Sequence, residues 1–180
     1  MKAIVQLARG ALVAALCAAA LSATAQDLTV GLSTPVTSLD PHFHNLSPNN
    51  NVADHVFEKL VAKDAKEQIR PGLAESWRTL DDLTWEFKLR KGVRWHDGSE
   101  FTADDVIATI KRIPNVPNSP ASFTTYTRPI ADVSAVDKHT LRIKTQRPHT
   151  LLPNDLVAIR LIQAKTAEAA TTADFNSGQL

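Results

Sequence analysis

Apolar and polar residues alternate most regularly between positions 83 and 90. Leu83, Trp85, Phe87 and Leu89 are large and apolar, and each residue between them is polar. Side chains of a strand point alternately to its two faces, so a period of two is typical of a strand with one buried face. The pattern therefore predicts a half-buried strand over residues 83–90.

A turn and a helix are predicted to follow this strand. Residues 96–98 are His-Asp-Gly, which has the composition of a tight turn. Thr102 is predicted to be the N-cap of the helix, because Asp105 lies where the acid of a capping box would return the hydrogen bond. An apolar stripe continues along this helix, and Pro114 is expected to end it.

Shorter periodic segments occur along the rest of the chain. Further strands are predicted over residues 28–33, 61–63, 78–80, 130–136, 140–145 and 157–163. Further helices are predicted over residues 52–60, 151–156 and 165–170, the first capped by Asn50 or Asn51, with a single helical turn within 70–77. Strand pairs that alternate with short helices indicate a mixed α/β fold class.

The first 25 residues have the pattern of an export signal. Lys2 and Arg9 are basic, residues 11–21 form a short apolar core, and residues 23–25 fit a small-x-small cleavage site. The core is shorter than the ~20 residues of a spanning helix. Leu16 precedes Cys17, where a lipoprotein signal has a small residue. We therefore predict a cleaved signal peptide over residues 1–25 and a soluble exported protein.

Composition limits what the remaining residues can do. Cys17 is the only cysteine, so its removal leaves no disulfide to support the fold. Removal of Lys2 and Arg9 leaves 18 basic residues against 19 acidic ones. Such a balance provides no basic footprint for nucleic acid, so no nucleic-acid partner is predicted.

The sequence offers little support for enzymatic chemistry. It has no phosphate-binding loop, dinucleotide fingerprint, CxxC pair or GxSxG motif. Asp97 follows His96, but the glycine after the pair favours a structural Asx turn over an acid-base role. We therefore predict a protein that is not an enzyme and has no cofactor.

Three stretches together carry a resemblance to a known family. They are SLDPH at residues 38–42, RPGLAESW at 70–77 and WEFKLRKGVRWHDGSEFTADDV at 85–106. With these motifs the chain resembles solute-binding protein family 5 of bacterial ABC importers. The resemblance implies the amino-terminal lobe of a two-lobe, type II periplasmic binding protein, expected to be a monomer. It also implies capture of a small solute, most often a di- or oligopeptide, for delivery to a membrane permease.

The resemblance also implies a division of the chain. Residues 26–48 would be the first strand and ligand-edge loop, 49–170 a mixed α/β subdomain, and 171–180 the start of a return to the ligand-binding lobe. The chain would then be an amino-terminal fragment, and half a cleft is expected to bind ligand weakly.

The ligand-edge segment after SLDPH supplies the predicted binding residues. They are His44, Asn45, Leu46 and Ser47. Many peptide binders of the family have an acidic residue in this stretch, whereas this chain has Asn45. This departure puts recognition of a ligand's amino terminus by this segment in doubt.

Two other classes of function remain open from sequence. The hairpins and the proline-rich stretch at 113–129 could contact a partner protein in a secreted interaction module. His42, His44 and His55 could bind a metal or metal complex, because imidazole suits transition metals. No second close-spaced pair completes a ligand set, so no metal site is predicted.

Overall fold

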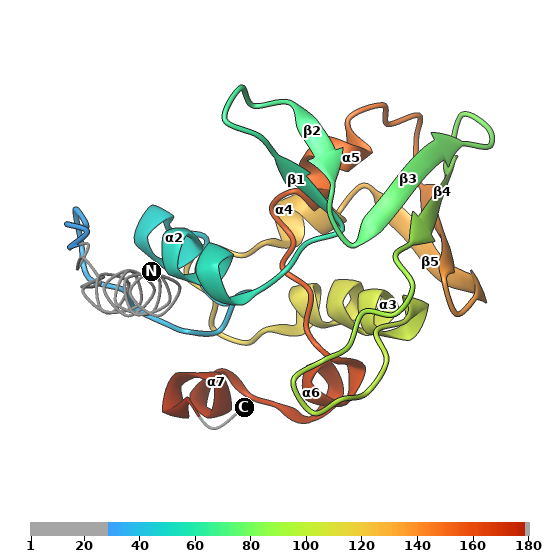
Figure 1. Cartoon of the computed structure of the whole chain (residues 1–180). Helices are drawn as coiled ribbons and strands as arrows, with labels where there is room; N and C mark the ends of the chain where they lie inside the picture. The colour runs from blue at the N-terminus through green and yellow to red at the C-terminus, as the bar shows by residue number, and fades with distance from the viewer. Residues whose placement is uncertain (1–28, 179–180) are drawn as a thin grey trace, which may run out of the picture. The chain divides into compact units, whose positions relative to one another are not determined.

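A computed structural model describes residues 29–178 (Figure 1). The predicted signal peptide lies outside this range. Contacts along the chain define two units, residues 1–32 and residues 33–180. All the helices and strands named below belong to the second unit.

A four-stranded antiparallel sheet forms the largest element of this unit. Its strands are β3 (Ala74–Thr79), β4 (Thr84–Leu89), β6 (Thr140–Thr145) and β5 (Ile130–Asp137), in that order across the sheet. Two hairpins therefore lie side by side and are joined through β4 and β6. Phe87 on β4 lies opposite Trp77 on one neighbour and Leu141 on the other, which places one apolar row across three strands. The predicted hairpins across residues 81–82 and 137–139 are confirmed.

A smaller sheet is formed by residues that precede the larger sheet in the sequence. Strands β1 (Val61–Lys63) and β2 (Ile69–Pro71) pair antiparallel. Gly72 follows β2 and passes so close to the chain before β1 that a Cβ atom would lie 2.5 Å from the carbonyl oxygen of Lys59. Only a residue without a side chain fits this approach.

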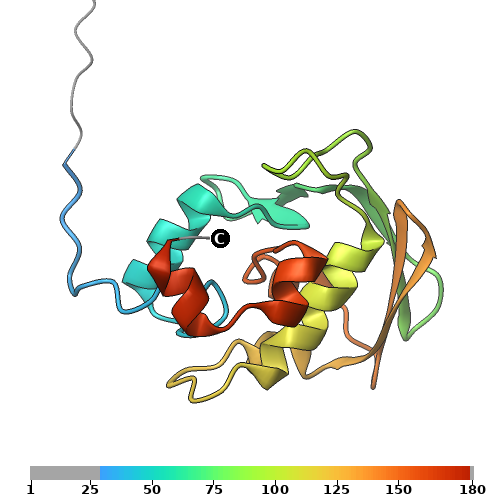
Figure 2. The ribbon, with the colours of Figure 1, turned by 90° about the horizontal axis from the view of Figure 1, so that it is seen from below.

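Short helices complete the unit. They are α2 (Ser47–Val56), α3 (Ala103–Arg112), the 3₁₀ turn η1 (Ile113–Asn115), α4 (Thr124–Thr127), α5 (Leu152–Leu156), α6 (Ala164–Ala169) and α7 (Thr172–Ser177). Figure 2 shows α3 beside the sheet with α6 next to it, and α3 contacts both α6 and β5. Within residues 29–178, no helix is long and apolar enough to cross a membrane.

Helix α3 begins as its sequence predicts. The backbone N–H of Thr102 donates to the carboxylate of Asp105 at 2.9 Å in a capping box. The same buried carboxylate accepts from the indole of Trp95 at 3.2 Å and from the backbone N–H of Ala164 at 2.8 Å. Asp105 therefore joins the helix start to the preceding turn and to α6.

The core lies between the inner face of the larger sheet and the helices. Its most deeply buried side chains include Phe87, Phe101, Val106, Phe123, Leu141, Ile143, Leu152 and Leu156. Trp77, Trp85 and Trp95 are partly buried against this cluster. Residues 29–178 contain no cysteine, so no disulfide supplements this apolar packing.

Three predicted elements are wrong. Residues 29–33 form no strand, because within the described chain no segment pairs with their backbone. Residues 157–163 form a single bridge, Lys59 to Arg160, in place of a strand. The helical turn expected within residues 70–77 is strand instead, because Trp77 pairs with Phe87 across the hairpin.

The helix predicted over residues 52–60 begins earlier and ends sooner. It spans Ser47–Val56, with Leu46 at the N-cap and proline in the first turn. Neither Asn50 nor Asn51 is the cap. Pro48 explains the early start, because proline has no N–H to leave unpaired and its fixed φ suits the first turn.

Candidate functional site

The predicted ligand edge is the bend that leads into α2. The backbone of His44 bridges that of Ala121, and the N–H of Asn45 donates to the carbonyl of Ala121 at 2.8 Å. His44, Asn45 and Leu46 are half-buried, and Ser47 is exposed. The structure thus brings all four predicted residues together on one supported segment. Whether they contact ligand stays a prediction.

The side chain of Asn45 is held on both sides. Its Oδ1 accepts from Nδ2 of Asn50 at 2.8 Å, and its Nδ2 donates to the hydroxyl of Tyr126 at 3.3 Å. Asn50 in turn accepts from the guanidinium of Arg160 at 3.1 Å. Arg160 is 3% exposed, so this support reaches from the core to the surface segment.

Arg160 also fixes the far end of α2. It donates to Oδ1 of Asp54 from Nε at 2.8 Å and from Nη2 at 2.6 Å. Asp54 pairs with Lys59 at 2.7 Å as well. A buried cation requires such partners, since unpaired burial of a charge is costly. Helix α2 is therefore anchored by one arginine at two positions.

His44 has its own support. Oγ1 of Thr37 lies 2.9 Å from Nδ1 of the imidazole. Thr37 is held in turn by the side chain of the buried Asn49, whose Nδ2 donates to Oγ1 at 3.0 Å. The imidazole is thus oriented by two residues that lie on either side of it in the sequence.

A buried ion pair lies directly before the predicted ligand edge. Asp40 accepts from Arg112 at 2.9 and 2.7 Å through its two oxygens, and the two side chains are 0% and 7% exposed. Burial opposes ionisation, but hydrogen bonds from Arg112 and Thr172 hold the pKa of Asp40 below its ordinary value. The carboxylate therefore stays charged and joins the SLDPH motif to α3.

Helix α7 contacts both members of this ion pair. The hydroxyl of Thr172 donates to Asp40 at 2.7 Å, and the guanidinium of Arg112 lies 4.8 Å from the ring centre of Phe175. Asn176 accepts from the hydroxyl of Ser38 and from the backbone of the next residue. The end of the described chain is thus tied to the segment that precedes the predicted ligand edge.

His42 is completely buried between these two networks. Its Nδ1 lies 3.0 Å from Nη1 of Arg112, which can only donate, so Nδ1 is the acceptor. Its Nε2 then carries the proton and donates to the carbonyl of Arg160 at 2.8 Å. Burial lowers the pKa of His42 to about 4, so the ring is neutral at ordinary pH.

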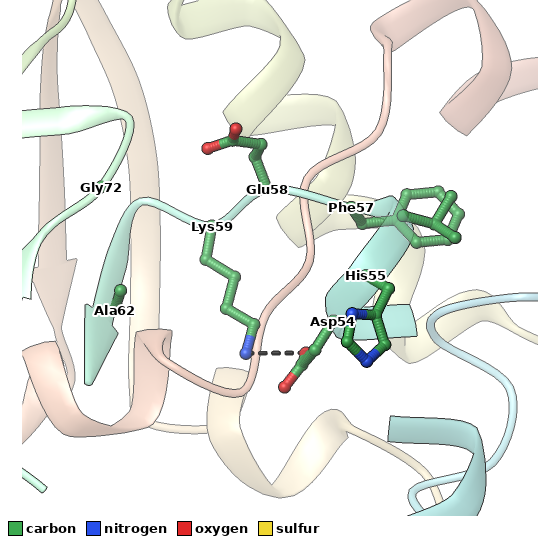
Figure 3. A pocket seen from close by; sticks show the side chains of 8 residues that line it. Asp54, His55, Phe57, Glu58, Lys59, Ala62 and Gly72 are labelled. Carbon is green, nitrogen blue, oxygen red and sulfur yellow. Dashed lines mark ion pairs between the residues drawn. The ribbon is translucent and has the colours of Figure 1, made fainter. Parts of the chain in front are cut away.

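One hollow of about 370 Å³ opens beside the end of α2 (Figure 3). Its lining includes residues 54–59, Ala62 and Gly72. The close-up shows Lys59 turned toward Asp54, so these opposite charges satisfy each other. The hollow contains none of residues 44–47, so we do not place the binding site there.

The histidines are not arranged as a metal site. Both ring nitrogens of His42 have partners, and His44 is oriented by Thr37. Within residues 29–178, no group of three or more histidine, cysteine or acidic side chains could hold an ion. Asp97 has the predicted structural role, because its Oδ1 accepts from the backbone and the hydroxyl of Ser99.

Sequence analysis missed the residues that support the edge. Thr37, Asn50, Tyr126 and Arg160 lie in no motif, and Arg160 is separated from Asn50 by 110 positions. The only signal was Arg160 itself, a cation inside the apolar run at 157–163. A charge in such a run requires a buried partner.

The architecture defines the class of protein. The structure of OppA from Burkholderia pseudomallei superposes with a TM-score of 0.77 over 88% of this chain and 34% of that one, at 24% identity. At this identity the likeness establishes the fold. The chain is part of a type II periplasmic binding protein fold, as the sequence predicted.

Residues 68–178 match the model of the bacterial extracellular solute-binding proteins, family 5. The chain belongs to this family. It is 34% identical over 139 residues to the periplasmic oligopeptide-binding protein OppA of Escherichia coli K12, covering 68% of this chain and 26% of OppA. It is 32% identical over 153 residues to the glutathione-binding protein GsiB of the same strain, covering 82% of this chain and 30% of GsiB. The chain thus spans less than a third of these relatives.

Proposed function

We propose that this chain supplies the amino-terminal lobe of a periplasmic binding component of an ABC importer. Its ligand is a di- or oligopeptide, which it captures and delivers to a permease at the membrane. The observation that carries the proposal is the family match over residues 68–178, together with relatives named for oligopeptide and glutathione binding. Glutathione is itself a tripeptide, so both names point to peptide-like ligands.

The geometry of residues 44–47 supports the same proposal. Peptides are commonly held through main-chain hydrogen bonds, which need a protein segment fixed in position. Here the backbone of Asn45 is bonded to Ala121, and its side chain is held from two sides. His44, Asn45, Leu46 and Ser47 would form one wall of the crevice, and a second lobe would close over the ligand.

The family to which the chain belongs is one of solute-binding proteins, not of enzymes. The proposed partners are therefore the ligand and the permease subunits. Export by the signal predicted at residues 1–25 would place the protein in the periplasm, where we expect a monomer without a cofactor.

Calorimetric titration of the protein at its natural length tests the proposal. The ligands are alanine peptides of two to five residues, with glutathione and nickel–histidine as separate titrations. Saturable micromolar or tighter binding of a peptide, about −8 kcal/mol or better, is the expected result. Binding of nickel–histidine alone, or of none of these ligands, would overturn it.

A further inference from the structure

The hydrogen bonds that support Asn45 all run in one direction. A guanidinium can only donate, so the group of Asn50 that meets Arg160 at 3.1 Å is the acceptor Oδ1. The other end of the Asn50 amide is then the donor Nδ2, which meets Oδ1 of Asn45 at 2.8 Å. Arg160 thus sets the orientation of both amides.

The hydrogen bonds that run from Arg160 through Asn50 and Asn45 to Tyr126 form a relay. Its orientation leaves hydrogen-bond donors at the outer end. Nδ2 of Asn45 donates to the hydroxyl oxygen of Tyr126 at 3.3 Å, so Tyr126 accepts and keeps its own proton to donate. In the part of the chain that the structure describes, no acceptor takes that proton. Tyr126 is half-buried, and the end of the relay is a hydroxyl donor next to the ligand edge.

His44 gives a second donor by an independent route. Oγ1 of Thr37 accepts from Asn49, so its proton is left for Nδ1 of His44 at 2.9 Å. The alternative acceptor, Oδ1 of Asn49, is farther away at 3.4 Å. A neutral imidazole that accepts at Nδ1 carries its proton on Nε2. His44 therefore also presents an N–H.

Acidic side chains near this segment are already paired with basic side chains. Asp40 is paired with Arg112 and shielded from water, and Asp54 is paired with Arg160 and Lys59. Residues 44–47 themselves contain no acid. The segment therefore has hydrogen-bond donors but no carboxylate with which to hold a cation.

We propose that this edge recognises an acceptor oxygen of the ligand, a carbonyl or a carboxylate, through Tyr126 and His44. Asn50 and Arg160 are the positioning residues that keep Asn45 and Tyr126 turned as donors. The inference rests on the proposed function, which it deepens by naming the ligand group that meets this lobe. An ammonium group would face N–H and O–H donors here and would gain no partner.

The substitution Asn50→Asp tests the direction of the relay. An aspartate still accepts from Arg160 but cannot donate to Asn45, which frees the Asn45 amide to turn its oxygen outward. Affinity for alanine peptides should fall roughly 10-fold. The matched control is Asn51→Asp, which adds the same charge at an exposed position of α2 and should change affinity less than about 2-fold.

The sign of the change separates the alternatives. If the edge held an ammonium, the added acid in N50D would leave binding unchanged or strengthen it, and that outcome would overturn the inference alone. Absence of peptide binding by the unsubstituted protein would overturn the proposed function and this inference with it. A thermal melt of each variant confirms that the protein is folded.

Tyr126→Phe provides a second variant that keeps the ring and removes the donor. It should weaken peptide binding roughly 3- to 10-fold, and unaltered binding would contradict the inference. Each peptide is titrated as free acid and as carboxamide. A Y126F loss confined to the free acid identifies a terminal carboxylate as the acceptor, whereas an equal loss for both identifies a main-chain carbonyl.

Discussion

Asp40 and Arg112 form a two-pronged ion pair, with oxygen–nitrogen distances of 2.9 and 2.7 Å, that is almost fully shielded from water. Seventy-two positions separate them in the sequence. The carboxylate also accepts from Thr172, so one acid fixes the relative positions of the SLDPH motif, α3 and α7.

Removal of one partner of this pair should be strongly destabilising. Arg112→Met leaves Asp40 charged and buried, and we expect the free energy of unfolding to fall by about 3–5 kcal/mol. Urea denaturation at low temperature measures it. Glu67→Gln is the control, because it breaks the exposed Lys63–Glu67 pair and should cost at most about 0.5 kcal/mol. Similar losses for the two variants would contradict the prediction.

His42 should make stability fall on acidification. Its folded pKa of about 4 lies below its ordinary value of 6.5, so between these pH values the unfolded chain binds a proton that the native state does not. The contribution of His42 to the free energy of unfolding is therefore fully present above pH 6.5. It is lost as pH falls toward 4, at up to about 1.4 kcal/mol per pH unit.

The variant His42→Gln should remove about one proton from that slope, measured by urea denaturation at several pH values. His55→Gln, at an exposed position of α2, is the control for the replacement of a histidine by glutamine. Equal slopes for H42Q and the unsubstituted protein would show that the buried ring does not resist protonation.

Asp105 should matter far more than its neighbour in the sequence. Asp105→Ala leaves three donors without their acceptor, from Thr102, Trp95 and Ala164. We expect a loss of about 2–4 kcal/mol in the free energy of unfolding. Asp104→Ala, at an exposed position of the same helical turn, should cost only about 0.5 kcal/mol. Comparable melting temperatures for the two variants would refute this assignment.

Gly72 should not tolerate a methyl group. A Cβ there would lie 2.5 Å from the carbonyl oxygen of Lys59 and 2.9 Å from that of Leu60, and backbone atoms cannot rotate away. Gly72→Ala should destabilise by about 1–3 kcal/mol in thermal denaturation. Gly31→Ala meets nothing within 4 Å and should stay within about 0.5 kcal/mol of the unsubstituted protein.

Local chemistry accounts for the parts of the fold that the sequence predicted. The N-cap of α3, its charge order and its end before Pro114 all depend on residues within one or two turns. The two hairpins likewise depend on short turns, such as the one in which Asp81 accepts from the backbone of Leu83 and Thr84.

The errors arose where distant partners decide the conformation. Residues 70–77 have a composition that suits a turn, but Trp77 becomes strand because Phe87 lies opposite it. Residues 157–163 have the apolar character of a strand, yet Arg160 directs its side chain to α2 and its backbone pairs only at Lys59. Neither pairing is visible in a short window of sequence.

The candidate site shows the same division. The position of residues 44–47 came from a motif and not from their chemistry. The residues that support this segment were predicted neither from a motif nor from their chemistry, because they are distant in the sequence. Tyr126, for example, lies 81 positions from Asn45. Sequence predicted the segment, and only the folded chain shows what orients its side chains.

The contact between Ser38 and Asn176 joins positions 138 apart. Closing so long a loop costs conformational entropy, which other contacts must offset. The Asp40 carboxylate accepts from Thr172 as well as from Arg112, so during synthesis its set of partners is complete only after Thr172 has emerged. The contact between Ser38 and Asn176 should therefore be among the last to form. The backbone amides around it should be among the first to exchange their hydrogens with solvent.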